Sequence, residues 1–430
     1  MQEKEYVGKS GVRVYSMENP AQHGFFLSLF VRAGSIYERE EESGITHFLE
    51  HVAIRNVHYL MDEQLYKMLD RLGLEFNAST FNEMVQFYIS GAKENFAKAA
   101  EILCRVFSRI ALPRSEIDLE RLRIKAEIRE GDEKNSLSAF TLGALYPDSP
   151  LKNSIVGTMR SVNAITGRRL EDYRAAALTA ENVFFYATGA VGDAEIGSLL
   201  SALESYEIPH GVCRESAPAL PKAFGNRACA VHIKNADFTM LRFNFDVDMA
   251  RVSSSELDLL YDYLLSGYGA RFFVEMSEKR GLFYDISGGI DRYKNGGLFY
   301  FSFEVKEKNV AQAIELVLQI LQDLKTNICK TEDLIKAPYV DNACLLYDDA
   351  RELNFTFAYD AHILGLPYRS LEDRREAYRK ITGERMREVA RAVFSRENLV
   401  LTVKGDKKKL NAEALSSLLR KIDGEACEFS

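Results

Sequence analysis

The chain has 430 residues, of which 47% are hydrophobic and 27% are charged, and its formal net charge is −8 at pH 7. This length exceeds what one hydrophobic core usually serves, so two or more domains are expected, and the composition is typical of a globular protein. A net negative charge gives no electrostatic reason to expect a nucleic-acid partner, and the absence of a run of eighteen apolar residues argues against a membrane span.

The N-terminus and the cysteines both favour a cytoplasmic protein. The first sixteen residues contain no apolar segment of the kind that a secretory signal requires. The six cysteines lie far apart and form no Cys-x-x-Cys pair; they are Cys104, Cys213, Cys229, Cys329, Cys344 and Cys427. This spacing argues against a cysteine zinc site and against a disulfide framework.

The first chemical motif lies in a predicted helix that Ser43 can cap, with apolar residues following at helical spacing. His47 and His51 are four positions apart, so their rings project from one face of this helix and suit two ligands of a zinc ion. Glu50 can reach a water at the metal without being a ligand. The order His-x-x-Glu-His is the inverted form of a metallopeptidase motif. By itself it also fits two histidines on a half-buried helix.

A catalytic zinc site needs a third protein ligand, and the later helix offers two candidates. This helix is predicted to begin at a capping pair, Ser115 and Asp118, and to end at Gly131. Glu120 and Glu127 are seven positions apart, about two turns, so both face the same way. One of them can bind the metal while the other orients a histidine. Without the histidine pair, the same pattern would indicate a charged surface helix.

Segments in the two halves of the chain repeat in the same order. Three pairs match: 165–189 with 381–405, the stretch from Val85 with that from Gly297, and the stretch from Phe25 with that from Met240. Three matches in one order indicate an internal repeat. The predicted fold is therefore α+β, with two homologous domains from an internal duplication, each an antiparallel-rich sheet packed by helices.

The predicted boundary between the domains is the stretch 208–227, which contains Pro and Gly and shows no periodicity. The N-terminal domain, 1–207, then holds every zinc candidate. The C-terminal domain, 228–430, is expected to be homologous to the first.

Taken together, these motifs resemble the pitrilysin/insulinase family of zinc metallopeptidases, the inverzincins, in the short two-domain type of the bacterial and mitochondrial processing enzymes. The family pattern is His-x-x-Glu-His, followed some seventy-five residues later by Glu-x(6)-Glu, whose second glutamate binds zinc. Here His51 and Glu127 are 76 positions apart. The stretches GSIYEREEESGITHFLEH and LDRLGLEFNASTFNE also resemble the family.

The resemblance implies one Zn²⁺ per chain, held by His47, His51 and Glu127. It implies that Glu50 is the catalytic base and that Glu120 is the supporting carboxylate. The implied activity is that of a zinc metalloendopeptidase, which cleaves peptides or unfolded segments inside a closed chamber.

The resemblance also implies substrate contacts, at Asn77, Ala78, Ser79 and Thr80 on an edge strand and at Tyr284 in the second domain. Strand addition would hold an extended peptide by its main chain, with little demand on its side chains. The alternative for residues 77–80 is a plain edge strand before a turn.

Ser277 departs from the family pattern Arg-x(6)-Tyr. Tyr284 is present, but Ser277 stands seven positions before it, and neither Arg271 nor Arg280 is in register. A serine cannot supply the permanent charge and the forked donors of an arginine. Members of the family work as dimers, and this departure favours a heterodimer with a zinc-free homologous subunit.

The alternative function is that of a non-catalytic scaffold or assembly subunit, because some relatives have become structural. Such a subunit is expected to have lost a metal ligand or the base, whereas both histidines and both glutamates are present here. A zinc hydrolase acting on another class of substrate has no supporting motif.

Overall fold

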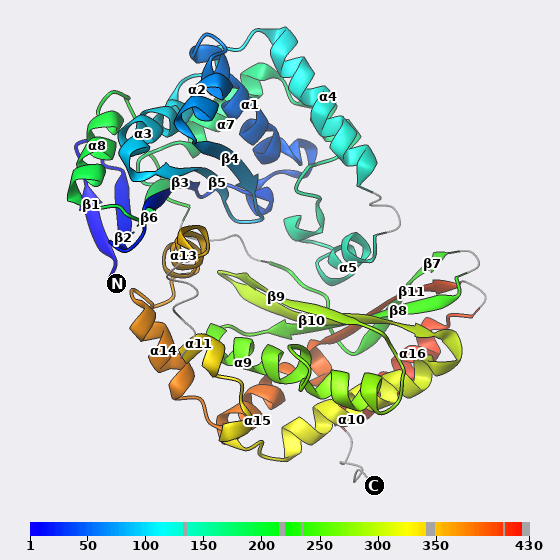
Figure 1. The fold of residues 1–430 in the computed structure, drawn as a ribbon. Coiled ribbons are helices and arrows are strands. Elements are labelled where there is room, and N and C mark those ends of the chain that lie inside the picture. Colours follow the sequence, from blue (N-terminus) through cyan, green and yellow to red (C-terminus); the bar gives the residue numbers. More distant parts are fainter. Residues whose placement is uncertain (132–135, 215–219, 234–235, 341–348, 407–408, 424–430) are drawn as a thin grey trace. The chain divides into compact units, whose positions relative to one another are not determined.

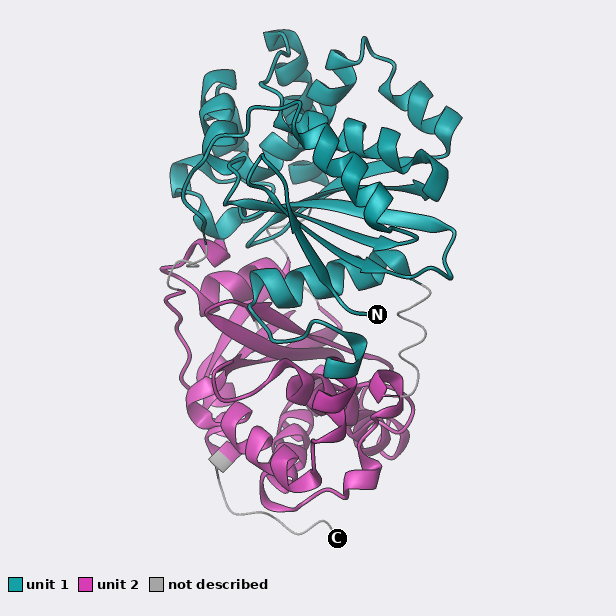
Figure 2. Cartoon of the chain, turned by 90° about the vertical axis from the view of Figure 1, so that its left-hand side faces the viewer, with its two compact units in different colours: residues 1–132, 153–219, 343–373 teal, residues 133–152, 220–342, 374–430 magenta. Residues whose placement is uncertain are grey.

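The structure is a computed structural model that describes residues 1–131, 136–214, 220–233, 236–340, 349–406 and 409–423. The chain divides into two compact units (Figures 1 and 2). Unit 1 comprises residues 1–132, 153–219 and 343–373, and unit 2 comprises residues 133–152, 220–342 and 374–430.

Unit 1 contains a six-stranded sheet in the order β1-β2-β6-β3-β5-β4. The strands are β1 (Lys4–Val7), β2 (Arg13–Glu18), β3 (Gly24–Val31), β4 (Glu75–Thr80), β5 (Val85–Ala92) and β6 (Val183–Gly189). Only β2 and β6 pair in parallel; the other neighbours are antiparallel. The strand β4 forms one edge of this sheet.

Helices cover both faces of this sheet. They are α1 (Ile45–Leu60), α2 (Leu65–Leu72), α3 (Phe96–Cys104), α4 (Arg114–Glu130), α6 (Met159–Ala164), α7 (Gly167–Ala177), α8 (Asp193–Leu203) and α13 (Ala350–Phe357). Side chains alternate between the faces of a strand, so Phe25 and Leu27 of β3 join the core beneath α3 and α8. Phe30 joins a second core that includes Phe357 of α13.

Unit 2 contains a five-stranded sheet in the order β7-β11-β8-β10-β9. The strands are β7 (Arg227–Ile233), β8 (Phe238–Val247), β9 (Ile286–Tyr293), β10 (Gly296–Lys306) and β11 (Leu399–Asp406). The helices are α5 (Leu137–Leu145), α9 (Ser254–Leu265), α10 (Val310–Thr326), α11 (Ala337–Val340), α15 (Gly383–Val393), α16 (Ala412–Leu419) and most of α14 (Leu371–Arg379). None of the described helices combines the length and the hydropathy that a membrane span requires.

The two sheets share one topology, which confirms the predicted α+β duplication. The order β2-β6-β3-β5-β4 in unit 1 corresponds to β7-β11-β8-β10-β9 in unit 2, with the single parallel pair at the same place. The three sequence matches fall on equivalent strands, β3 with β8, β5 with β10 and β6 with β11. Each sheet is antiparallel-rich and packed by helices, as predicted.

The units differ from the predicted contiguous domains, 1–207 and 228–430, in two short segments. The helix α5, from the first repeat, packs in unit 2, where Thr141 Oγ1 lies 2.7 Å from Thr402 Oγ1 of β11. The helix α13, from the second repeat, packs in unit 1. Each repeat thus contributes one helix to the unit formed mainly by the other repeat. An alignment of the two repeats cannot reveal this exchange, because the two sheets are similar and either one could bind an amphipathic helix. The described residues between 207 and 226 form no helix or strand.

The buried side chain of Asn354 anchors α13 on the sheet of unit 1. Its amide nitrogen donates to the carbonyl oxygens of Phe26, at 3.1 Å, and Tyr186, at 2.8 Å, and its oxygen accepts from the hydroxyl of Ser28 at 2.8 Å. Such groups are costly to leave unpaired when buried. The bonds therefore hold a helix of the second repeat to β3 and β6.

We expect Asn354→Ala to lower the free energy of unfolding of unit 1 by about 2–4 kcal/mol, because buried polar groups lose their partners. Hydrogen–deuterium exchange at β3 and β6 measures this change locally. The exposed Asn163 provides the control, since Asn163→Ala should cost less than about 0.5 kcal/mol. Unchanged exchange in Asn354→Ala would show that α13 is not held in this way.

Candidate metal centre

The helix α1 carries the two histidines, and its start differs from the prediction. It begins at Ile45 with Gly44 as N-cap, in a left-handed conformation (φ 87°), and no side chain caps it from the N-cap position. The predicted cap by Ser43 is therefore wrong. Instead, the Glu38 carboxylate accepts hydrogen bonds from the backbone N–H groups of Gly44, at 2.7 Å, and Thr46, at 2.8 Å.

Glu38 is a buried carboxylate that sequence reasoning missed, because it lies several residues before the helix it caps. Burial raises the pKa of Glu38, while the hydrogen bonds from Thr46 and Gly44 oppose that rise. A negative charge at a helix N-terminus is favourable. The contact fixes the backbone one residue before His47.

The helix α4, which carries the two glutamates, packs against α1 (Figure 1). The predicted cap by Ser115 and Asp118 is wrong, since α4 begins at Arg114 after Pro113 without a side-chain cap; Gly131 follows its last residue, as predicted. The two helices share a hydrophobic core that contains Phe48, Val52, Ile117 and Ile124 among others. The guanidinium of Arg121 also lies 4.9 Å from the centre of the Phe48 ring.

This packing brings His47, His51 and Glu127 together. One ligand atom from each of the three lies within 4.8 Å of the other two. Glu127 Oε2 lies 3.0 Å from His47 Nε2, and Glu127 Oε1 lies 3.5 Å from His51 Nε2. The Glu127 side chain is 42% exposed, so the cluster is open to solvent on one side. Two imidazole nitrogens and one carboxylate are a donor set that suits a catalytic zinc ion, and the residues present fit such an ion.

Glu120 contacts His51 at the ring nitrogen that is not turned toward Glu127. Its Oε2 lies 3.4 Å from His51 Nδ1, and its Oε1 accepts a hydrogen bond from Arg123 Nη1 at 2.7 Å. The side chain is almost fully buried, and although burial opposes ionisation, the contacts with His51 and Arg123 lower the pKa of Glu120. A hydrogen bond at Nδ1 leaves Nε2 of His51 free to bind a metal.

Glu50 lies beside the cluster but outside its three-atom set. Its Oε2 lies 3.6 Å from His47 Nδ1 and accepts a hydrogen bond from the Thr80 hydroxyl at 2.5 Å. Burial opposes ionisation, but the contacts with His47 and Thr80 outweigh it and lower the pKa of Glu50. The same carboxylate and that of Glu127 raise the pKa of His47 against the effect of burial. The lowered pKa favours the ionised form of the Glu50 carboxylate, next to the candidate ligands.

The predicted substrate strand, residues 77–80, lies in the edge strand β4. In the hairpin that β4 forms with β5, the N–H of Phe81 donates to the carbonyl of Met84 at 2.8 Å. Bonded positions alternate along an antiparallel pair, so Phe76, Ala78 and Thr80 direct their backbone groups away from β5. In agreement, the N–H of Ala78 donates to the side-chain oxygen of Asn77 at 2.9 Å. The outer edge of β4 therefore directs main-chain groups away from β5, and no other described strand pairs with this edge.

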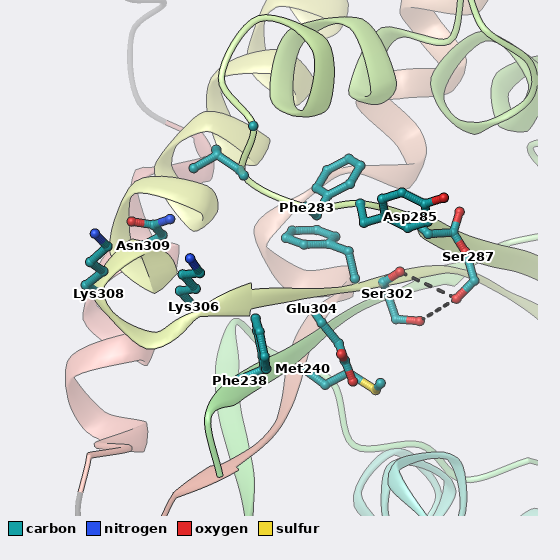
Figure 3. Close-up of a pocket in the computed structure, with 14 residues that line it drawn as sticks. Phe238, Met240, Phe283, Asp285, Ser287, Ser302, Glu304, Lys306, Lys308 and Asn309 are labelled. Atoms are coloured by element: carbon teal, nitrogen blue, oxygen red, sulfur yellow. Dashed lines mark hydrogen bonds between the residues drawn. The ribbon is translucent and has the colours of Figure 1, made fainter.

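The predicted substrate residue of the second domain, Tyr284, is 97% exposed and lines an open groove of about 820 Å³ in unit 2. Figure 3 shows this groove, with the hydroxyls of Ser287 and Ser302 facing each other and Phe283 on its wall. Ser277 is partly buried, and its hydroxyl donates to the carbonyl of Phe283 at 2.9 Å.

Both nearby arginines are engaged elsewhere in unit 2. Arg271 pairs with Asp323 at 2.8 Å, and Arg280 pairs with Glu275 at 3.1 Å. Neither replaces the arginine that the family pattern places at position 277.

Comparisons with known proteins identify the family. Residues 13–159 match the model of the insulinase family (peptidase family M16), and residues 164–335 match that of the peptidase M16 inactive domain. The chain therefore belongs to the insulinase family, peptidase family M16, as its motifs indicate.

Individual relatives are distant in sequence and close in fold. An uncharacterised zinc protease of Mycobacterium leprae is 24% identical over 317 residues, which are 72% of this chain and 71% of the relative. The beta subunit of the human mitochondrial-processing peptidase is 27% identical over 217 residues, 50% of this chain and 43% of that subunit. The crystal structure of a peptidase M16 inactive domain from Pseudomonas fluorescens superposes with a TM-score of 0.84 at 17% identity, covering 95% of this chain and 99% of that one.

We expect Glu127→Ala to weaken zinc binding by more than about a hundredfold, because loss of a ligand should exceed the 10–100-fold cost of losing an outer contact. Zinc content after dialysis, measured by mass spectrometry, tests this expectation. Glu130→Ala, one turn along the same helix, is the matched control and should keep its zinc. If zinc survives Glu127→Ala, then Glu120 or Glu130 is the true ligand.

Proposed function

We propose that this chain is a zinc metalloendopeptidase, with His47, His51 and Glu127 as ligands of one Zn²⁺ and Glu50 as general base. The observation that carries the proposal is the convergence of these side chains. Three ligand atoms from two helices lie within 4.8 Å of one another, and the ionised carboxylate of Glu50 lies beside them. Zinc proteases among the relatives support the choice of metal.

The chemistry divides between the metal and the protein. A bound zinc ion supplies a Lewis acid that polarises a carbonyl and makes water more acidic. Glu50 accepts the proton of the attacking water and then donates it to the nitrogen of the leaving amine. The lowered pKa of Glu50 keeps the carboxylate ionised at neutral pH, as a base must be. Glu120 holds the ring of His51 through Nδ1.

The proposed substrate is an extended peptide or an unfolded segment, cleaved within a closed chamber of the kind that the family resemblance implies. The open edge of β4 supports strand addition, because backbone groups of Phe76, Ala78 and Thr80 point away from β5. Main-chain pairing selects for extended conformation and makes little demand on sequence. Thr80 touches Glu50, so a peptide paired here would lie next to the base.

We expect Glu50→Gln to bind zinc normally and to lower kcat by at least about a thousandfold, because the amide cannot accept the proton of the attacking water. Peptide cleavage is measured alongside zinc content, and Glu41→Gln, a change at an exposed position, is the control. Substantial turnover by Glu50→Gln would remove Glu50 from this role. A wild-type chain purified without zinc and without activity would instead favour the scaffold alternative.

We further propose that the active form is a heterodimer with a zinc-free homologous subunit. Ser277 stands where the family has an arginine, and its hydroxyl is bonded to the Phe283 carbonyl, while Arg271 and Arg280 form ion pairs of their own. The second domain of this chain thus has a serine at position 277 in place of the arginine guanidinium, with its permanent charge and its forked hydrogen-bond donors. A partner's second domain would supply an arginine and a tyrosine to the zinc site of this chain.

If this is correct, the chain purified alone is weakly active, and Ser277→Arg raises its kcat/KM by about 10–100-fold, the value of one charge-assisted hydrogen bond. Ser277→Lys adds a positive charge without the paired hydrogen-bond donors of a guanidinium, so it should raise kcat/KM less than Ser277→Arg does. Size-exclusion chromatography with and without a co-expressed homologue reports assembly. A fully active homodimer of the wild-type chain, unaffected by Ser277→Arg, would contradict the proposal.

We also propose a cytoplasmic location. Among the described residues, Cys104, Cys229 and Cys329 are free thiols, which suits a reducing compartment. Cys344 and Cys427 lie outside the described residues.

A further inference from the structure

We propose that Thr80 is a positioning residue for Glu50, so that the strand which receives the peptide also orients the base. This inference rests on the proposed peptidase function and assigns Thr80 a second task besides the strand pairing expected for residues 77–80. Thr80 is the last residue of β4 and is partly buried. Its hydroxyl donates to Glu50 Oε2 at 2.5 Å.

The surroundings of Glu50 leave Thr80 as its principal anchor. On one side lies a small, mostly apolar void lined by Val31, Leu49, Val85 and Phe87 among others. The one hydroxyl side chain in its lining, Thr46, is hydrogen-bonded to the hydroxyl of Tyr173 at 2.8 Å. The other neighbour is His47 Nδ1, at 3.6 Å, and His47 is itself a proposed metal ligand. Among the described residues, Thr80 supplies the one hydroxyl bonded to Glu50.

The contact with Thr80 involves one oxygen of Glu50. Both Thr80 and His47 approach Oε2, and Oε1 accepts no hydrogen bond from a described residue. Oε2 is also the Glu50 oxygen that lies beside the cluster, 3.6 Å from His47 Nδ1, so the Thr80 hydroxyl holds the carboxylate next to the candidate ligands. Without the hydroxyl, the side chain can rotate and the productive orientation becomes less populated.

Thr80 joins this role to peptide binding because its main chain and its side chain point in different directions. The hairpin pairing directs the backbone N–H and C=O of Thr80 to the open edge of β4, where a peptide strand would pair. The side chain meanwhile reaches α1 and Glu50. Pairing with a peptide restrains this residue and, through its hydroxyl, restrains the base. Seating of the peptide and alignment of Glu50 are therefore coupled.

The test compares Thr80→Val, which keeps the shape and removes the hydroxyl, with Thr80→Ser, which keeps the hydroxyl. We expect Thr80→Val to lower kcat by about 10–100-fold, the value of a hydrogen bond to a charged group, with KM changed less than about twofold and zinc content unchanged. Thr80→Ser should recover kcat to within about threefold of wild type. Thr326→Val, at an exposed site in unit 2, is the control for the same chemical change.

A second readout does not depend on activity. In crystals of the metal-free and zinc-loaded forms, Glu50 should hold one rotamer in wild type and Thr80→Ser and should lose it in Thr80→Val. A single unchanged Glu50 rotamer in Thr80→Val would overturn the proposal, even if the wild-type chain proved to cleave no peptide. Three kinetic results would also overturn it. They are an unchanged kcat in Thr80→Val, an equal loss of kcat in Thr80→Val and Thr80→Ser, and an effect on KM alone.

Discussion

The packing of α4 against α1 is the constraint on which the candidate centre depends. The two histidines are placed by one helical turn, but the carboxylate of Glu127 reaches them only because apolar residues of both helices share a core. The stack of Arg121 on Phe48 and the capping of α1 by Glu38 fix the same pair of helices. Burial of apolar side chains between the two helices therefore holds His47, His51 and Glu127 close together before a metal binds.

The two units have similar sheets, but the candidate metal cluster lies in unit 1. Both units have the same strand order, yet α9, which occupies in unit 2 the place of α1, contains no histidine. Among the described residues, the one group able to hold a metal lies in unit 1. The exchange of α5 and α13 makes each unit depend on both repeats. Unit 2 can therefore lack the metal-binding motif and still be needed for the fold, because α5 of the first repeat packs in it.

Much of the fold and of the candidate site could be predicted from local sequence patterns. The four-residue spacing of His47 and His51 and the repeated strand-to-helix segments depend on neighbours in the chain, and these predictions agree with the structure. The predictions that failed concern the side-chain caps of α1 and α4, and contacts made across the fold were not predicted. Ser43 has the chemistry of a cap, but Glu38 takes that role from outside the helix. The pairing of Asn354 with β3 and β6 and the contact of Thr80 with Glu50 join residues far apart in sequence, where no periodicity reports them.

In the proposed metal centre, one zinc ion lies between the two histidines and Glu127. Anomalous scattering at the zinc absorption edge, from crystals of the chain purified without added metal, tests it most directly. We expect a single peak about 2.0–2.2 Å from Nε2 of His47, Nε2 of His51 and a carboxylate oxygen of Glu127. A peak elsewhere, or an ordered Glu127 carboxylate out of coordinating range of a zinc bound to the histidines, would contradict it.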